Sequence, residues 1–299
     1  MKIVFFGTSD VGLPILEALH HEHTILKVIT SPDAPVGRKQ VITPSPIADK
    51  ASMLGLSVEK PLKVKNNPEF IESLTALRAD IFIVVSYGKI LPEELLNIPS
   101  LKTINIHFSL LPKYRGASPI QFALTNDEIV TGTTIFILDA LVDHGPILAQ
   151  QELSIAPDDT LTTLAPKLSE LSKNLLLDIL PKYESGEIIP YEQNHDEATH
   201  VSLIEKEDGK IDWNNSAQSI YNQFPGFIVW PGIWTTWEEK KLKILGCQPV
   251  LVQEPGTLTI PCGDNSLLQI TILQPEGKNP MTAKDFLNGY PRFDFTHLK

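Results

Sequence analysis

Residues 103–116 read Thr-Ile-Asn-Ile-His-Phe-Ser-Leu-Leu-Pro-Lys-Tyr-Arg-Gly. The first five residues of this stretch have the composition of a strand, and the proline and glycine that follow indicate a loop. Asn105 and His107 are two residues apart, so strand alternation places both side chains on one face near the carboxyl end. Ligands of open α/β sheets bind outside those ends. The stretch therefore predicts a sheet with a candidate site at its edge.

Strands and helices alternate on both sides of this stretch. The predicted strands cover residues 2–6, 24–30, 81–85 and 103–107, and the predicted helices cover residues 13–20, 68–77, 119–124 and 161–183. Apolar strands that alternate with helices are typical of a parallel sheet covered on both faces. We therefore expect an α/β fold with a Rossmann-like, parallel-rich sheet. Its first turn, Gly7-Thr8-Ser9-Asp10, lacks the dinucleotide fingerprint, which disfavours nicotinamide chemistry.

The character of the chain changes after Gly186. Residues 187–209 are polar and irregular, and beyond them short apolar runs alternate with Pro-Gly and Gly-Asp turns. Many short strands with regular turns indicate a small β-barrel. We predict a first domain over residues 1–186, a linker over residues 187–209 and a β domain over residues 210–299.

Composition narrows the classes of function. The net charge of −11 argues against a general nucleic-acid binder, although residues 208–299 are nearly neutral, with nine acidic and eight basic residues. The two cysteines, Cys247 and Cys262, suggest neither a zinc site nor a disulfide framework. Apolar runs such as residues 81–85 are far too short to span a bilayer, so we expect a soluble, cytoplasmic protein without a membrane partner.

The polar pair on the predicted strand suits acyl transfer to an amine. A lone histidine is more often structural than catalytic, but an asparagine beside it at a strand end favours the catalytic interpretation. The Asn105 amide can stabilise a developing oxyanion, and a neutral His107 imidazole can accept the proton of the amine. The third member should be a carboxylate. Asp139, which we expect to end a strand, and Asp143, in the loop that follows, are both candidates, although either residue could belong to an ordinary turn. His144 has no further support as a catalyst.

Residues 105–116, together with residues 139–145, resemble the signature of the folate-dependent formyltransferases. The resemblance implies that Asn105 and His107 work with Asp143, that 10-formyltetrahydrofolate donates the formyl group, and that no metal is needed. It also implies a folate site lined by Ser109, Leu110, Leu111 and Pro112 and flanked at the pterin by Leu138, Ala140 and Val142.

Other segments resemble the branch of that family that formylates methionyl-tRNA. They are residues 6–8, 31–38, 44–46, 87–92, 205–206, 211–213, 230–232, 255–256, 263–264 and 273–281. The resemblance implies initiator methionyl-tRNA as the acceptor and an OB-like C-terminal domain, over residues 210–299, that helps to bind the tRNA. It implies a monomer with tRNA contacts at Arg38, Lys39 and Lys206. Ala34 and Gln40 stand where that branch is usually more basic, which predicts a weaker electrostatic hold on tRNA.

Two other functions compete with this interpretation. A formyltransferase acting on an amino-sugar nucleotide would share Asn105, His107 and Asp143 and would explain the acidic charge. A protein that binds folate or tRNA without catalysis would not need all three residues. The resemblance along nearly the whole chain favours formylation of methionyl-tRNA.

Overall fold

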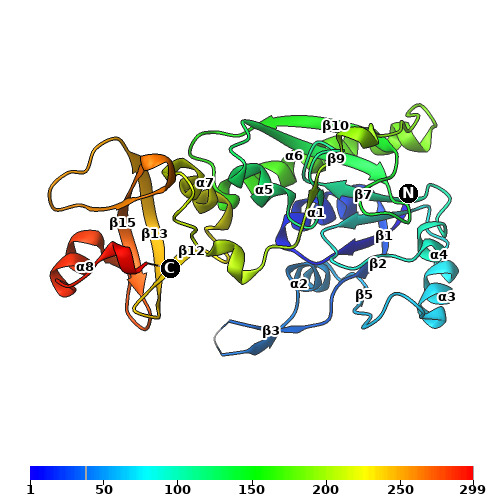
Figure 1. The fold of residues 1–299 in the computed structure, drawn as a ribbon. Helices are drawn as coiled ribbons and strands as arrows, with labels where there is room; N and C mark the ends of the chain where they lie inside the picture. The colour runs from blue at the N-terminus through cyan, green and yellow to red at the C-terminus, as the bar shows by residue number, and fades with distance from the viewer. Residues whose placement is uncertain (38, 299) are drawn as a thin grey trace. The chain divides into compact units, whose positions relative to one another are not determined.

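The computed structural model describes residues 1–37 and 39–298, and these residues form two compact units. Of the described residues, the first unit contains 1–37, 39–119, 130–154 and 165–201, and the second contains 120–129, 155–164 and 202–298. Each unit has a sheet and a core of its own, and Figure 1 labels their elements.

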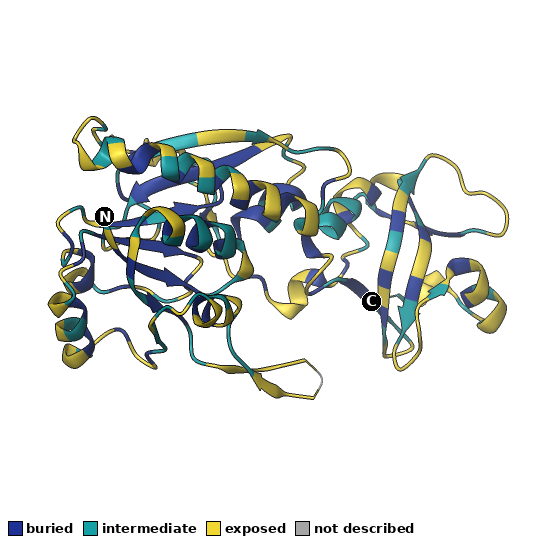
Figure 2. Cartoon of the chain, turned by 180° about the vertical axis from the view of Figure 1, so that it is seen from behind, coloured by how far each residue is buried: buried dark blue, intermediate teal, exposed yellow. Residues whose placement is uncertain are grey.

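Seven strands form the sheet of the first unit. Their order is β10 (Ile147–Ser154), β9 (Val130–Ile137), β7 (Thr103–His107), β6 (Ile81–Val85), β1 (Lys2–Gly7), β2 (Thr24–Ile29) and β5 (Val58–Glu59). The five strands from β7 to β5 are parallel. At the other edge, β9 runs antiparallel to its two neighbours, β7 and β10. Strand β6 and nearly all of β1 are buried along their length (Figure 2), as expected for a sheet covered on both faces.

Helices cover this sheet (Figure 1). They are α1 (Leu13–Glu22), α2 (Pro46–Met53), α3 (Pro68–Ala76), α4 (Glu93–Leu96) and the long α6 (Leu161–Glu184). Alternate residues of β1 serve different faces: Val4 and Phe6 share a core cluster with Phe70 and Leu74 of α3, and the ring of Phe5 lies near the turn at Gly12. Ser45 and Asn67 cap α2 and α3 by accepting hydrogen bonds from backbone N–H groups, which sets where these helices begin.

Small elements complete the first unit. A hairpin pairs β3 (Ala34–Val36) with β4 (Val41–Thr43), and a two-stranded parallel pair joins β8 (Arg115–Gly116) to β11 (His200–Val201). The β8–β11 pair brings the segment after residue 186 against the loop that follows β7. The domain boundaries at residues 186 and 210 stay a prediction, but residues 187–201 fold as part of the first unit.

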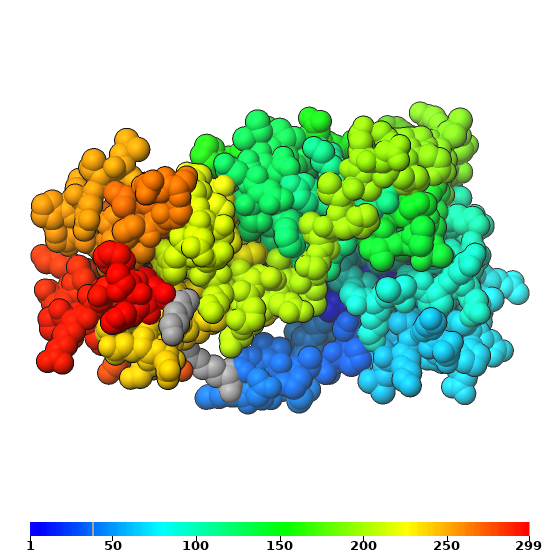
Figure 3. Space-filling model, in the orientation of Figure 1, coloured from blue at the N-terminus to red at the C-terminus, as the bar shows by residue number. Residues whose placement is uncertain are grey.

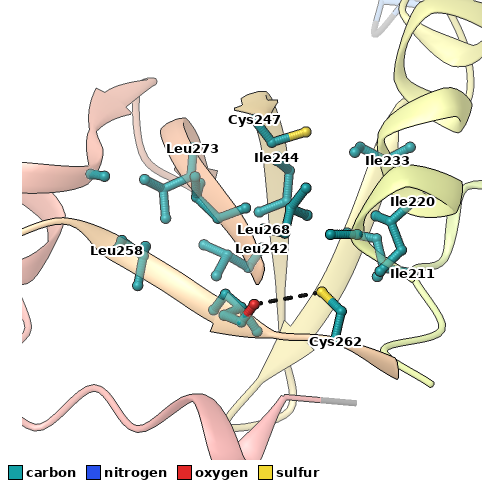
Figure 4. Packing of buried hydrophobic residues seen from close by; sticks show 14 of the residues in the cluster. Ile211, Ile220, Ile233, Leu242, Ile244, Cys247, Leu258, Cys262, Leu268 and Leu273 are labelled. Atoms are coloured by element: carbon teal, nitrogen blue, oxygen red, sulfur yellow. Dashed lines mark hydrogen bonds between the residues drawn. The ribbon is translucent and has the colours of Figure 1, made fainter. Parts of the chain in front are cut away.

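The second unit is built on a five-stranded antiparallel sheet. Its strands are β12 (Ile233–Trp237), β13 (Lys240–Val250), β15 (Leu267–Pro275), β14 (Leu258–Pro261) and the short β16 (Met281–Thr282). Helices α5 (Pro119–Thr125), α7 (Ala217–Phe227) and α8 (Ala283–Gly289) accompany it. Figure 4 shows aliphatic side chains from β13, β14 and β15 meeting Ile220 of α7, with both cysteines at the margin of this core.

The predicted fold class is confirmed: a mostly parallel α/β sheet is followed by an antiparallel β unit. Two details were wrong. Pro225-Gly226, interpreted as a turn, lies inside α7, and the strand expected to reach Asp139 ends at Ile137. Within residues 1–37 and 39–298, no helix is both long and apolar enough to cross a membrane.

Candidate functional site

Strand β7 positions the first two candidate residues. It lies between β6 and β9, so that Asn105 is opposite Val84 and Phe136, and His107 is opposite Thr134. The alternation of the strand puts both side chains on one face at its carboxyl end. Asn105 is half-buried, whereas His107 is only 6% exposed. Both polar groups are therefore fixed by the strand rather than by a surface loop.

The imidazole of His107 has two different neighbours. Its Nε2 lies 2.8 Å from the carbonyl oxygen of Tyr114, and because a carbonyl can only accept, Nε2 must donate the proton. In the neutral ring the lone pair is then on Nδ1. Nδ1 lies 3.6 Å from Oδ2 of Asp143. The structure thus presents the basic nitrogen of His107 towards a carboxylate.

Asp143 occupies the loop between β9 and β10. Its backbone has φ +47°, and its Oδ2 accepts a 2.7 Å hydrogen bond from the backbone N–H of Gly116. Gly145 closes the loop: a Cβ there would lie 2.0 Å from the carbonyl oxygen of Ile137, so only glycine fits. The carboxylate is therefore held from two sides, through its own loop and through β8.

The loop that follows His107 is tied to the sheet by hydrogen bonds. Thr134 Oγ1 donates to the Ser109 carbonyl at 2.6 Å, and Gln150 Nε2 donates to the Leu111 carbonyl at 2.8 Å. Ser109 Oγ donates to the Lys113 carbonyl, and this residue is fully buried. Leu110 and Pro112 are half-buried, and the peptide bond before Pro112 is cis.

The loop that contains Asp143 has a mixed surface. Leu138 is half-buried against the core, whereas Ala140 and Val142 are exposed. Asp139 accepts from Leu141 N and pairs with His144 Nδ1 at 2.7 Å, so Asp139 makes its contacts away from His107. Of the two aspartates that the sequence left open, Asp143 is the one near the histidine.

Of the three residues expected to contact tRNA, the structure describes two, one in each unit. Arg38 is outside the described residues. Lys39 is exposed in the turn between β3 and β4 of the first unit. Lys206 begins a short helical turn, Lys206–Gly209, in the second unit, where its carbonyl accepts from Trp234 Nε1.

Sequence reasoning missed two polar residues of this site. Gln193 and Arg115 are both buried, and the Gln193 Oε1 accepts hydrogen bonds from the Arg115 guanidinium. Gln193 lies in the segment predicted as a linker, where no periodicity points to a buried side chain. The only local signal was Arg115 itself, a charged residue in the signature that had no role assigned.

The arrangement supports proton transfer and charge stabilisation. Asn105 offers an amide donor, His107 offers an unshared pair on Nδ1, and Asp143 can stabilise the imidazolium that forms there. Among the described residues, no group of histidine, cysteine, aspartate and glutamate side chains is arranged to bind a metal ion.

Comparisons with known proteins show which proteins this chain resembles. A family model described as formyl transferase matches residues 1–180, and a model of the formyl transferase C-terminal domain matches residues 203–291. A methionyl-tRNA formyltransferase of Koribacter versatilis is 44% identical over 97% of this chain and 96% of its own. The enzyme of the same name from Enterococcus faecalis is 41% identical over 96% of both chains.

Solved structures share the fold at lower identity. An N-formyltransferase from Helicobacter canadensis, in complex with folinic acid and dTDP-3-aminofucose, superposes with a TM-score of 0.68 at 20% identity, over 92% of this chain and 99% of that one. HypX from Aquifex aeolicus, in complex with tetrahydrofolic acid, superposes with a TM-score of 0.62 at 16% identity. That match covers 98% of this chain and 48% of HypX, so this chain spans about half of its length.

Proposed function

The chain belongs to the methionyl-tRNA formyltransferase family, and from this premise we propose which of its residues carry out the transfer. The enzyme formylates the free amino group of methionyl-tRNA. The observation that carries the proposal is the orientation of His107, whose Nε2 donates to a backbone carbonyl while Nδ1 faces Asp143. Within this family the donor is a formyl-tetrahydrofolate, and for this chain we propose 10-formyltetrahydrofolate.

Each residue of the proposed catalytic triad has a separate task. The Asn105 amide donates a hydrogen bond to the formyl oxygen as negative charge develops there. His107 accepts the proton of the attacking amine at Nδ1, the nitrogen that is not committed to the Tyr114 carbonyl. Asp143 Oδ2 stabilises the resulting imidazolium, and the Gly116 N–H keeps that oxygen in place.

The residues around the triad fit a folate. Leu141 and Val142 expose 59% and 55% of their surface directly before Asp143, so apolar contact for a flat ring lies next to the polar groups. We propose that residues 138–142 flank the pterin and that residues 109–112 line the same site. The donor supplies a formyl carbon that is already activated on nitrogen.

The transfer is direct in this proposal: the amine nitrogen bonds to the formyl carbon, the bond from that carbon to the donor nitrogen breaks, and tetrahydrofolate leaves with the proton that His107 took from the amine. Ser109 is the nearest hydroxyl along the chain to His107, but its Oγ donates to the Lys113 carbonyl and the residue is fully buried. The two cysteines belong to the core of the second unit. Because neither the Ser109 hydroxyl nor a cysteine thiol is available to His107 as a nucleophile, we expect no formyl-enzyme intermediate.

The remaining parts of the proposal concern partners. We propose initiator methionyl-tRNA as the natural acceptor, with contacts from Arg38, Lys39 and Lys206, and a monomeric enzyme that works in the cytoplasm, where initiator tRNA is used. Formylation of an amino-sugar nucleotide is not favoured, because the relatives that match at 37–44% identity along the whole chain are methionyl-tRNA formyltransferases.

A formylation assay tests the residue roles. We expect the wild-type protein to release tetrahydrofolate with charged initiator tRNA and not with a dTDP-amino sugar. Asp143→Asn should lower kcat strongly, because the imidazolium loses its anionic partner. Intact mass spectrometry during turnover should find no formyl-enzyme. A trapped formyl-enzyme, or an Asp143→Asn variant with wild-type kcat, would contradict the proposed mechanism.

A further inference from the structure

We propose that Gln193 is a positioning residue that holds the Asp143 loop in its catalytic geometry; this inference rests on the proposed role of Asp143. Gln193 is only 5% exposed, although Glu192 and Asn194 on either side of it are exposed. Figure 3 shows the surrounding segment, residues 187–201 in yellow-green, on the surface of the molecule. One amide side chain therefore points inwards from an otherwise polar surface segment.

The amide nitrogen of Gln193 holds the backbone of the Asp143 loop. Nε2 donates to the carbonyl of Asp143 at 3.0 Å and to the carbonyl of Gly145 at 2.8 Å. A primary amide has two N–H donors, and both are engaged here. The loop needs such support because Asp143 adopts the left-handed backbone conformation that side-chain-bearing residues rarely adopt.

The amide oxygen of Gln193 connects the same loop to β8. Oε1 accepts from Arg115 Nε at 3.2 Å and from an Arg115 terminal nitrogen at 2.7 Å. Arg115 is 4% exposed and precedes Gly116, whose N–H donates to Asp143 Oδ2. Gln193 thus connects the backbone of Asp143 with the strand that holds the Asp143 carboxylate.

Other charged and titratable groups border this connection. The same terminal nitrogen of Arg115 donates to His195 Nδ1 at 2.8 Å, and the His195 ring stacks on His144 at 4.1 Å. His144 in turn pairs with Asp139. None of these contacts involves His107 or the Asp143 carboxylate, so they can support the Asp143 loop without occupying the proposed reacting groups.

Substitutions of Gln193 can separate its support of the Asp143 loop from its hydrogen bonds with Arg115. A glutamate at position 193 would keep the hydrogen bonds from Arg115, since a carboxylate accepts from a guanidinium at least as well as an amide oxygen. It would lose both donors and would place an anionic oxygen against the two carbonyls. Gln193→Glu therefore preserves the partner of a buried arginine and removes the support of the Asp143 loop, whereas Gln193→Met removes both.

The experiment measures kcat, KM and unfolding for Gln193→Glu and Gln193→Met in the full-length protein. We expect both variants to lower kcat about 10- to 100-fold, because the displacement of a catalytic group by about 1 Å can lower the rate roughly 100-fold. KM for methionyl-tRNA should stay unchanged, and both variants should lower the denaturation midpoint, Gln193→Met because it leaves Arg115 without this acceptor and Gln193→Glu because it places an anionic oxygen against two carbonyls. Gln151→Met, at an exposed position of β10, is the matched control and should behave like the wild type.

A double-mutant cycle with Asp143→Asn completes the test. If Gln193 acts through Asp143, Gln193→Met should lower kcat little further in the Asp143→Asn background. Wild-type kcat in Gln193→Glu would overturn the inference and leave Gln193 as a partner of Arg115 alone. So would a double variant in which the effects of Gln193→Met and Asp143→Asn on kcat are fully additive. If Gln193→Glu has wild-type kcat while Asp143→Asn is inactive, only the role of Gln193 is overturned and the proposed role of Asp143 stands. An active Asp143→Asn would overturn the proposed catalytic role as well.

Discussion

The two units place their buried polar groups differently. In the first unit, His107 at the carboxyl end of β7 and the polar residues Ser109, Arg115 and Gln193 are all buried and hydrogen-bonded. The buried cluster of the second unit is apolar and made mostly of aliphatic side chains, which alternate with exposed residues along β13, although Thr235 and Thr259 are also buried. A site for chemistry needs fixed donors and acceptors, whereas a surface for a nucleic acid needs only exposed charge on a stable support. Substitutions should therefore act on kcat in the first unit and on stability or affinity in the second.

The largest expected effect is at Asn105. Asn105→Ala removes the proposed donor to the developing oxyanion, and the loss of one such donor costs roughly 100- to 1,000-fold in kcat. The side chain is only half-buried, so the variant should fold normally and bind folate as the wild type does. Steady-state kinetics, folate titration and the urea midpoint check these three expectations. Near-native kcat would remove the role assigned to Asn105.

The second prediction concerns the core of the second unit. Leu268 is fully buried on β15, and Leu268→Ala should lower the free energy of unfolding by about 2–5 kcal/mol because it removes apolar contact and leaves a cavity. The kcat of the molecules that remain folded should change little. Leu245→Ala, at a position 37% exposed on β13, is the control and should cost less than about 1 kcal/mol. Denaturant titration followed by activity at low denaturant separates the two quantities. A large fall in kcat of Leu268→Ala with an unchanged free energy of unfolding would contradict the expectation that substitutions in the second unit act on stability and not on kcat.

The third prediction concerns phosphate contacts. Lys206→Ala should raise KM for methionyl-tRNA and reduce the slope of log KM against log salt by about one, as expected when one phosphate contact is lost. Folate binding and kcat should be unchanged. Lys284→Ala, also exposed in the second unit, is the control with no assigned contact. Equal salt slopes for Lys206→Ala and the wild type would show that Lys206 does not contact the tRNA backbone.

The sequence predicted those parts of the site that depend on local spacing. Asn105 and His107 share a face because strand side chains alternate, and this follows from two positions on one strand. Gln193 could not be found this way, since its partner Asp143 is 50 residues away and the residues beside Gln193 are exposed. Its segment is held against the rest of the first unit by the bridge of Tyr191 to Ile147 and by the pairing of β8 with β11, contacts between distant residues that no local pattern encodes.

The errors in the fold have similar causes. The helix α7 was missed because Pro225-Gly226 is a turn signal, but these residues come near the end of the helix, and Gly226 lies so close to Gln121 that a side chain would not fit. The direction of β9, which runs antiparallel to both of its neighbours β7 and β10, was also not predicted, because alternation identifies a strand but not its direction.

The smallest expected effect concerns the two cysteines of the second unit. Burial raises the pKa of Cys247 to about 12 and that of Cys262 to about 11, both above the ordinary 9.0. Between pH 9 and these values the unfolded chain releases thiol protons that the folded chain keeps, so the free energy of unfolding falls as pH rises through this window. Below pH 9 the folded and the unfolded chain both keep the thiol protons. In that range the cysteines should therefore not contribute to any pH dependence of the free energy of unfolding.

Denaturant titrations between pH 8 and pH 11, on the wild type and on Cys247→Ala, measure this difference. The alanine variant should be less stable throughout because a buried side chain is truncated, but its stability should fall less steeply above pH 9. Iodoacetamide at pH 8 should hardly modify the native protein and should modify both thiols once denaturant is added, because the reactive species is the thiolate. Parallel stability curves for the two proteins, or rapid alkylation of the native protein, would show that Cys247 is not the buried, neutral core residue that the second unit requires.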